Sequence, residues 1–354
     1  MIHTSQRQRA WSRRTVGVLL AATIAGVVSP ATAAPATGSP AAAAAAAPDA
    51  RSSRHPDVIH GSAPSLHPEG VAYDARRDAF LVGSVTHGTV SLVTPYGSAR
   101  TLVDDPKLVT TMGLTVDQRR GRVLVTNADL GVADRSTPDT ENRLAGLGIY
   151  DLNSGRRLHY VDLGRLLPGR QHFANDIAVD RAGNAYVTDS LSGAIYKVTP
   201  HGHASVLVQD DRLAGTTEGF GLNGVVLHPD GYLIGAMSAE GALVRIPLDQ
   251  PRKFRRVDLS APIGSPDGLL LSRTGTLYAI DNTSKNRVIE LGSTDGWSST
   301  REVRSVPWPD PAPTTLAASP GGPYVLTGRL DLLLSGTRSD EFQLRRLPEG
   351  GYGR

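Results

Sequence analysis

The sequence predicts an all-β fold, a six-bladed β-propeller with four-stranded blades around a central channel. Short apolar strands and polar turns recur in one order along the chain. The first strands of the six repeats start 43, 63, 48, 44 and 47 residues apart. A period in the forties with several strands per unit is typical of propeller blades. The 38 glycines and 24 prolines then serve as turn residues rather than helix residues.

Each repeat contains a first strand, a polar turn and a second strand. First strands are predicted at 71–73, 114–116, 177–179, 225–227, 269–271 and 316–318. Second strands follow at 80–82, 123–125, 185–187, 232–234, 276–278 and 324–326, and third strands are visible at 193–198 and 241–246. The longest step predicts an insertion at 130–144, as a loop over one mouth of the propeller. An array of β-sandwiches is the structural alternative, but the uniform period favours the propeller.

The first 33 residues have the order of an export signal. Four arginines precede an apolar stretch of 14 residues at 15–28, and Ala31, Thr32 and Ala33 form an A-x-A-like cleavage site. The apolar stretch is shorter than the roughly 20 residues that span a bilayer. The pair Arg13 and Arg14 resembles a twin-arginine signal; an ordinary Sec signal and an uncleaved anchor are the alternatives. The sequence therefore predicts a secreted, extracytoplasmic protein, with no integral membrane span after cleavage.

The positive charge of the chain belongs to this signal. Removing its four arginines from the 37 basic residues leaves 33 basic residues against 34 acidic ones, a net charge of −1. A near-neutral chain offers no basic footprint, so no nucleic-acid partner is expected. An Ala/Pro-rich linker is predicted at 34–51, with seven alanines at 41–47 between two prolines. The propeller domain is predicted at 52–354, and we expect a monomer.

Six residues occupy one register position in the repeats. Blades are related by rotation, so the residue two before each first strand should lie on a ring around the axis. The ring is predicted to consist of Glu69, Met112, Asn175, Asn223, Asp267 and Thr314. Asn-Gly and Asp-Gly are ordinary turn dipeptides, so each residue alone is weak support for a site. Their shared register is what favours one.

Oxygen-bearing side chains on this ring point to a divalent cation. Glu69 and Asp267 would repel each other on a common axis unless a cation or a proton lay between them. The chain contains no cysteine, which excludes thiolate metal sites, Fe–S clusters and cysteine nucleophiles. Oxygen ligands favour Ca²⁺ first, with Mg²⁺, Mn²⁺ and Zn²⁺ as alternatives.

The motifs Glu69-Gly70, Asn175-Asp176, Asn223-Gly224 and Pro266-Asp267-Gly268 open inner strands of the predicted propeller. In this order and spacing they resemble the senescence-marker-protein/gluconolactonase (regucalcin-like) family over about 66–347. The resemblance implies a metal held by Glu69, Asn223 and Asp267, with Asn175 as a further ligand or substrate contact. It also implies hydrolysis of a sugar lactone or another lactone, with Asp267 as the catalytic base.

Two departures from the family pattern concern the substrate. Val71 stands where the family commonly has proline after Glu-Gly. No clear match exists for the Arg/Asn pair that contacts sugar hydroxyls in the second blade of some members; Asn127 and Asp129 are the nearest candidates. A lactone that is not a sugar therefore remains open.

Histidines supply a minority hypothesis for the base. His67 and His172 lie two and three residues before ring positions, and His172 is also a candidate substrate contact. A histidine base would resemble the paraoxonase-like lactonases. Asp189 and Asp281 end second strands and are expected to support the ring or to act as turn residues.

Other motifs carry less weight. Residues 219–224 fit G-x-G-x-x-G by letter, but a strand follows where a dinucleotide site needs a helix. No serine-hydrolase elbow or zincin motif is present in the sequence. The sequence thus predicts a metal-dependent hydrolase with a small-molecule lactone substrate. The alternative is a non-catalytic propeller that binds a ligand or partner around a structural ion.

Overall fold

The computed structural model describes residues 55–216, 219–283 and 285–349. The export signal predicted at 1–33 and the linker predicted at 34–51 lie outside the described residues. None of the helices in the described part of the chain has the length and hydropathy needed to cross a bilayer.

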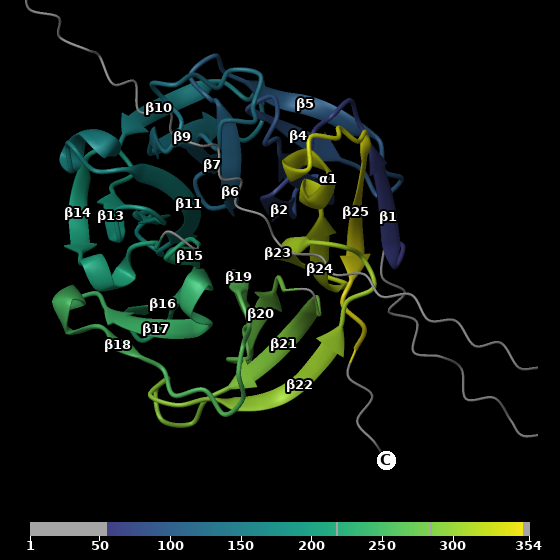
Figure 1. The fold of residues 1–354 in the computed structure, drawn as a ribbon. Helices are drawn as coiled ribbons and strands as arrows, with labels where there is room; N and C mark the ends of the chain where they lie inside the picture. The colour runs from purple at the N-terminus through teal and green to yellow at the C-terminus, as the bar shows by residue number, and fades with distance from the viewer. Residues whose placement is uncertain (1–54, 217–218, 284, 350–354) are drawn as a thin grey trace, which may run out of the picture. The chain divides into compact units, whose positions relative to one another are not determined.

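Six β-sheets follow one another around a central axis, which confirms the predicted propeller (Figure 1). The first blade contains β2 (Val71–Asp74), β3 (Ala79–Gly83), β4 (Thr89–Val93) and β5 (Ala99–Asp104). The second contains β6 (Thr110–Asp117), β7 (Arg122–Ala128), β9 (Gly146–Asp151) and β10 (Arg157–Asp162). The third contains β11 (His172–Val179), β12 (Ala185–Asp189), β13 (Ala194–Val198) and β14 (Ala204–Gln209).

The remaining blades repeat this order. The fourth contains β15 (Leu222–His228), β16 (Tyr232–Met237), β17 (Ala242–Pro247) and β18 (Arg255–Arg256). The fifth contains β19 (Pro266–Leu271), β20 (Leu277–Asp281), β21 (Arg287–Gly292) and β22 (Arg301–Pro307). The sixth contains β23 (Pro313–Ser319), β24 (Gly322–Thr327), β25 (Glu341–Arg346) and, from the start of the domain, β1 (Val58–Ser62).

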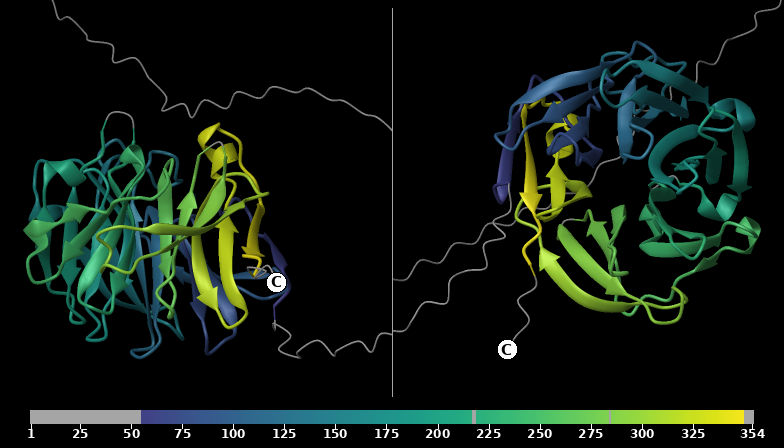
Figure 2. Two further views of the ribbon diagram at one scale, coloured as in Figure 1. Left: turned by 90° about the horizontal axis from the view of Figure 1, so that it is seen from below. Right: turned by 180° about the vertical axis from the view of Figure 1, so that it is seen from behind.

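Helical structure is confined to short segments between the strands. The helix α1 (Leu330–Leu334) lies between β24 and β25, at one end of the propeller (Figure 2). Four 3-10 turns, η1 (Gly164–Leu166), η2 (Asp211–Leu213), η3 (Ser238–Glu240) and η4 (Pro251–Lys253), complete the helical segments of the described residues.

The predicted first and second strands are the two innermost strands of each blade. Their antiparallel registers repeat around the ring: Val71 pairs with Val82, Ile177 with Val187 and Leu269 with Ala279. The apolar runs of these strands are buried because each sheet packs against the sheets on both sides. Equivalent sequence positions therefore do occupy equivalent places around the axis.

The last blade is closed by the start of the domain, which the repeat pattern did not predict. Strand β1 pairs antiparallel with β25, and Ile59 lies opposite Leu344 (Figure 1). The preceding segment is also tied down, because the Tyr324 hydroxyl donates to Pro56 O at 2.7 Å. This closure joins the two ends of the domain in one sheet and leaves β25 without a free edge.

The insertion at 130–144 connects β7 to β9 and changes the strand count of the next blade. Its short strand β8 (Arg143–Leu144) pairs in parallel with the start of β11, so the third sheet has five strands rather than the predicted four. The insertion is bonded to the first blade, where Asp134 N donates to Thr86 O. It also contacts the sixth blade, because Arg338 donates to Asp134 at 2.6 Å. These contacts place the insertion at the end where the inner strands begin.

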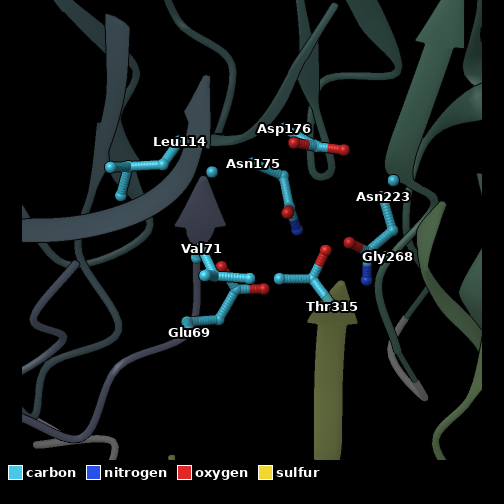
Figure 3. Close-up of a pocket in the computed structure, with 11 residues that line it drawn as sticks. Glu69, Val71, Leu114, Asn175, Asp176, Asn223, Gly268 and Thr315 are labelled. Carbon is cyan, nitrogen blue, oxygen red and sulfur yellow. The ribbon is translucent and has the colours of Figure 1, made fainter. Parts of the chain in front are cut away.

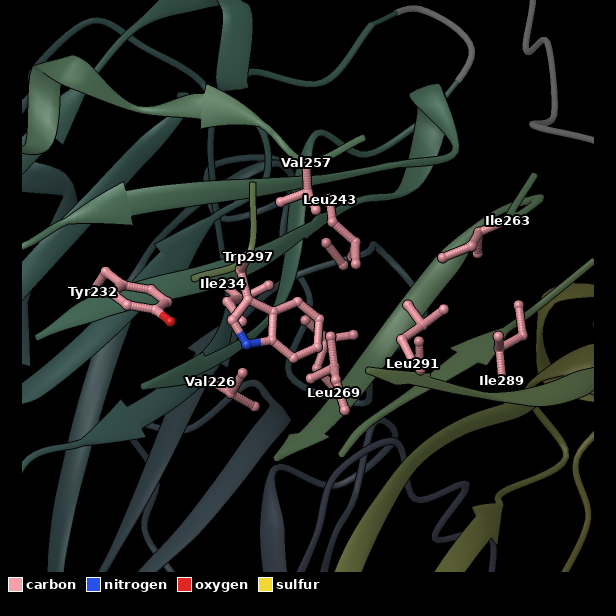
Figure 4. Close-up of a cluster of buried hydrophobic side chains, with 13 residues drawn as sticks. Val226, Tyr232, Ile234, Leu243, Val257, Ile263, Leu269, Ile289, Leu291 and Trp297 are labelled. Atoms are coloured by element: carbon pink, nitrogen blue, oxygen red, sulfur yellow. The ribbon is translucent and has the colours of Figure 1, made fainter. Parts of the chain in front are cut away.

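Buried apolar side chains lie between neighbouring blades rather than in one central core. Figure 4 shows the cluster between the fourth and fifth blades, where Ile234 and Leu243 meet Leu269, Ile289 and Trp297. Comparable clusters fill the other five blade interfaces. The axis itself is not filled by this packing, and a cavity runs along the inner strands.

Candidate metal and catalytic site

The predicted ring residues come together at the beginning of the inner strands. Glu69, Asn175 and Asn223 line one small cavity on the axis, together with Thr315 (Figure 3). Figure 3 shows these four side chains pointing toward one another from different blades. Asp267 does not line this cavity but lies next to it, because Asn223 hydrogen-bonds to its carboxylate and its charge acts on Glu69.

Glycine next to the ring residues allows the inner strands to approach this closely. The residue after each ring position is Gly70, Gly113, Gly224 or Gly268 in four of the six blades. A Cβ at Gly70 would overlap Met112 O, and one at Gly224 would overlap Asp267 O. The glycines of these motifs are therefore needed for close packing of backbone against backbone, besides forming turns.

A chain of hydrogen bonds fixes the amide ligands and links three blades. Asn175 Nδ2 donates to Ser190 Oγ at 3.0 Å, and Ser190 Oγ donates to Leu222 O at 2.5 Å. Asn223 Nδ2 donates to Ser238 Oγ at 2.9 Å, and Ser238 Oγ donates to Pro266 O at 2.6 Å.

Each of these two serines thus joins a ring amide of its own blade to the peptide just before the next ring residue. Because the amide nitrogens are engaged in this way, the carbonyl oxygens Oδ1 of Asn175 and Asn223 are the ends available as ligands.

The carboxyl groups of the site hold protons more tightly than ordinary carboxyls. Burial, together with the charges of Asp267 and Asp176, raises the pKa of Glu69 well above its usual value. Burial raises the pKa of Asp267 to about 7, although hydrogen bonds from Asn282 and Asn223 oppose the rise. The Asn282 bond joins Nδ2 to Asp267 Oδ2 at 3.2 Å. A bound cation would favour the charged carboxylates and so oppose these shifts.

Asp176 is a third carboxylate of the site, and we did not single it out from the sequence. It lines the same cavity, and burial raises its pKa to about 6. Its Oδ2 accepts from Val225 N at 2.9 Å and its Oδ1 from Ile177 N at 2.8 Å. A signal was present: four other blades have glycine at this register, and Asp176 alone carries a charge there.

The residues present fit a hard divalent cation. Within residues 55–216, 219–283 and 285–349, no arginine, lysine or histidine forms a salt bridge with Glu69, Asp176 or Asp267. The described residues also contain no group of three or more His, Cys, Asp or Glu arranged to hold a metal by themselves. The donor set is therefore mixed, with carboxylate and amide oxygens, which suits Ca²⁺ or Mg²⁺ better than Zn²⁺.

Acceptors at the ends of three second strands fix the turns that lead into the ring. Asn127 Oδ1 accepts from Val109 N and Thr110 N, and Asp281 accepts from Gly264 N and Ser265 N. Asp189 Oδ1 accepts from Phe173 N at 2.9 Å. These amides lie two or three residues before ring positions, so Asp189 and Asp281 do support the ring, through the backbone.

The candidate substrate contacts outside the ring are engaged in internal hydrogen bonds. Besides the bonds to its Oδ1, Asn127 donates from Nδ2 to Lys107 O and to the Tyr160 hydroxyl. Asp129 accepts from Gly131 N, Ser136 Oγ and Thr140 Oγ1, which shapes the start of the insertion. The structure does not bring these two residues to the cavity, and their contact with substrate stays a prediction.

The two candidate histidines are also held by internal partners. His172 Nδ1 lies 2.7 Å from Asp189 Oδ2 and Nε2 lies 3.0 Å from Leu167 O. Although burial opposes it, the Asp189 carboxylate raises the pKa of His172. His67 Nε2 accepts from Ser339 N at 2.9 Å, and burial lowers the pKa of His67. Both rings support loops at the mouth, so the geometry favours a carboxylate over a histidine as the base.

A model of the protein family described as the SMP-30/Gluconolactonase/LRE-like region matches residues 67–318. Solved structures share the fold at low identity. The major Malassezia sympodialis allergen Mala s 1 is 19% identical, with a TM-score of 0.67, over 83% of this chain and 96% of its own.

A gluconolactonase from Xanthomonas campestris is 17% identical, with a TM-score of 0.56, over 82% of this chain and 89% of its own. The calcium-binding protein regucalcin from Agrobacterium tumefaciens is 16% identical, with a TM-score of 0.56, over 82% of this chain and 95% of its own. No curated protein matches the sequence.

Proposed function

Because the chain belongs to the SMP-30/gluconolactonase/LRE-like family, we propose that it is an exported, metal-dependent hydrolase that opens a lactone. The observation that carries the proposal is the group of carboxylates and amides on the axis, which has no protein cation of its own among the described residues. Glu69, Asn175, Asn223 and Asp267 would hold the ion. The gluconolactonase and the calcium-binding regucalcin among the structural neighbours support the same class.

The reaction adds water across the ring ester of the lactone. The water oxygen bonds to the carbonyl carbon, the bond from that carbon to the ring oxygen breaks, and the ring oxygen takes up a proton to give a hydroxy acid. A divalent cation bound here supplies Lewis acidity toward the carbonyl oxygen and lowers the pKa of bound water.

Asp267 is the group that accepts the proton from water. With a cation bound beside it, the carboxylate would be charged at neutral pH and able to take up that proton as a general base. Asn282 and Asn223 hold its carboxylate by hydrogen bonds and so set its orientation.

A lactone screen with controlled metal content tests this function. The mature protein is treated with a chelator, reloaded with Ca²⁺, Mg²⁺, Mn²⁺ or Zn²⁺, and assayed on sugar, aliphatic and aromatic lactones. We expect hydrolysis that is lost with the chelator and restored by one ion per chain. A metal-free protein that retains full activity would contradict the metal role. Cation binding without turnover of any lactone would favour a ligand-binding propeller with a structural ion.

The raised carboxyl pKa values predict an unusual pH dependence for the metal-free protein. Between about pH 4 and pH 7 the folded chain holds protons on Asp267 and Asp176 that the unfolded chain has released, since exposed Asp titrates near 3.9. The folded state then binds more protons, so the free energy of unfolding falls as the pH rises through this window. We expect a loss on the order of 3 kcal/mol from pH 5 to pH 8 in urea unfolding with chelator.

Added Ca²⁺ should restore this stability at pH 8, because the ion takes the place of the protons. His172 acts in the same direction, since its raised pKa also favours the folded state at lower pH. The Asp267→Asn variant therefore serves as the control, and its pH dependence should be flatter. An equally steep dependence in that variant would assign the effect to the other groups with raised pKa values, Glu69, Asp176 and His172.

A further inference from the structure

The ring of the proposed site has a polar side and an apolar side. In each blade the residue two after the ring position pairs with a residue of the second strand, as Ile177 pairs with Val187. The residue three positions after that partner is Ser190 in the third blade, Ser238 in the fourth and Asn282 in the fifth. In the first two blades the same position is Val85 or Ala128. The hydroxyl and amide groups of the polar side bond to ring residues, as described above, whereas the first two blades have only carbon side chains at this position.

The apolar side continues upward as one cluster, which we call the mouth cluster. Its buried members are Val85, Met112, Ala128, Phe173 and Leu333, and its partly buried members are Leu130, Val132, Leu191, Phe220 and Leu330. They come from the ends of β6, β7 and β11, from loops of the first, third and fourth blades, from the insertion and from α1. Met112 is itself a ring residue, so the cluster begins at the level of Glu69 and Asn175 and extends to the mouth.

The mouth cluster should discriminate strongly between lactones. The hydroxyls of a sugar lactone would leave water and meet carbon on this side, and each polar group buried without a partner costs about 1–3 kcal/mol. An alkyl chain gains about 0.8 kcal/mol for each methylene that it buries. Three polar side chains of the first two blades, His67, Asn127 and Asp129, are engaged with the protein.

We propose that the substrate is a lactone with an apolar alkyl or acyl substituent, which lies against the mouth cluster while the ester faces the carboxylates. This inference rests on the proposed lactone hydrolysis. Phe220 is the member of the mouth cluster best suited to substitution, because its side chain is partly exposed. Its ring stacks on that of Phe173, with 4.8 Å between the ring centroids.

Lactones with one common ring test the proposal. The Ca²⁺-loaded protein is assayed on δ-valerolactone, δ-hexalactone, δ-decalactone and glucono-δ-lactone, which share a six-membered ring. We expect kcat/KM to rise about fourfold per added methylene until the alkyl chain covers the mouth cluster. The kcat/KM for glucono-δ-lactone should be at least tenfold below that for δ-decalactone. Calorimetry with the δ-lactam that corresponds to δ-decalactone measures binding of the same chain without hydrolysis.

The variant Phe220→Ser should reduce the preference for δ-decalactone over δ-valerolactone at least fivefold and weaken binding of the lactam. The matched control is Phe254→Ser, a partly buried phenylalanine on the outer side of the fourth blade; it should leave the preference unchanged. A preference for glucono-δ-lactone, or no dependence on chain length, would overturn the inference and leave lactone hydrolysis standing. No turnover of any of the four lactones would overturn both.

Discussion

Replacing Asp267 by Asn should reduce lactone hydrolysis by about a thousandfold or more and abolish tight cation binding. The substitution keeps the size of the side chain but removes its charge and its ability to take a proton from water. Loss of a general base alone typically costs about 10²- to 10⁴-fold, and loss of an anionic ligand weakens the hold on the ion. Steady-state kinetics and calorimetric titration with Ca²⁺ measure the two effects.

The fold should survive this change. Asp267 lies at the start of β19, and its carboxylate bonds to Asn282 rather than to the strand ladder. Far-UV circular dichroism of Asp267→Asn should match the parent protein. The control Asp249→Asn changes an exposed aspartate and should retain activity and cation binding. Activity within tenfold of the parent in Asp267→Asn would refute its role as the base.

Removing β1 is the second large effect that we expect. A chain that begins at residue 63 lacks the outer strand of the sixth blade, which exposes the edge of β25 and the apolar side chains beneath it. An open hydrophobic edge favours aggregation. We expect this chain to be insoluble or to lose cooperative unfolding, whereas a chain that begins at residue 52 should behave like the mature protein.

A point variant separates packing from the loss of a whole segment. Ile59 is 1% exposed and lies opposite Leu344, so Ile59→Ala should lower the free energy of unfolding by about 2–5 kcal/mol. Val303 lies on the outer strand of the fifth blade at 50% exposure, and Val303→Ala should change it by less than about 0.5 kcal/mol. Equal stabilities of Ile59→Ala and the parent would show that the closure contributes little.

Repetition made the architecture predictable. A β-blade buries apolar residues at fixed spacing, so each repeat carries the same alternation of strands and turns, and six copies of a weak pattern reinforce one another. The ring residues were found by the same logic, because rotation brings equal register positions together. Glu69, Asn175 and Asn223 line one cavity in the structure for this reason.

Features that break the repeat were not predicted. Strand β1 precedes the first repeat, and its partner β25 lies almost three hundred residues later, so no local pattern connects them. Asp176 was visible as a departure from glycine, but only its burial beside other carboxylates identifies it as part of the site. Asn127, Asp129 and His172 are polar residues of the kind that bind ligands, yet their partners lie on neighbouring strands and loops.

The sequence by itself determined the blade repeat, the absence of thiolate chemistry and which residues share the ring, because these follow from periodicity and composition. Only the tertiary structure decided which polar side chains are free to act. Hydrogen bonds between neighbouring strands and blades engage Asn127, Asp129, His67 and His172. Burial on the axis leaves the carboxylates with raised pKa values and no protein cation among the described residues. The hydrogen-bond partner of a side chain and its removal from water both depend on packing between strands and blades, so neither can be read from a single repeat.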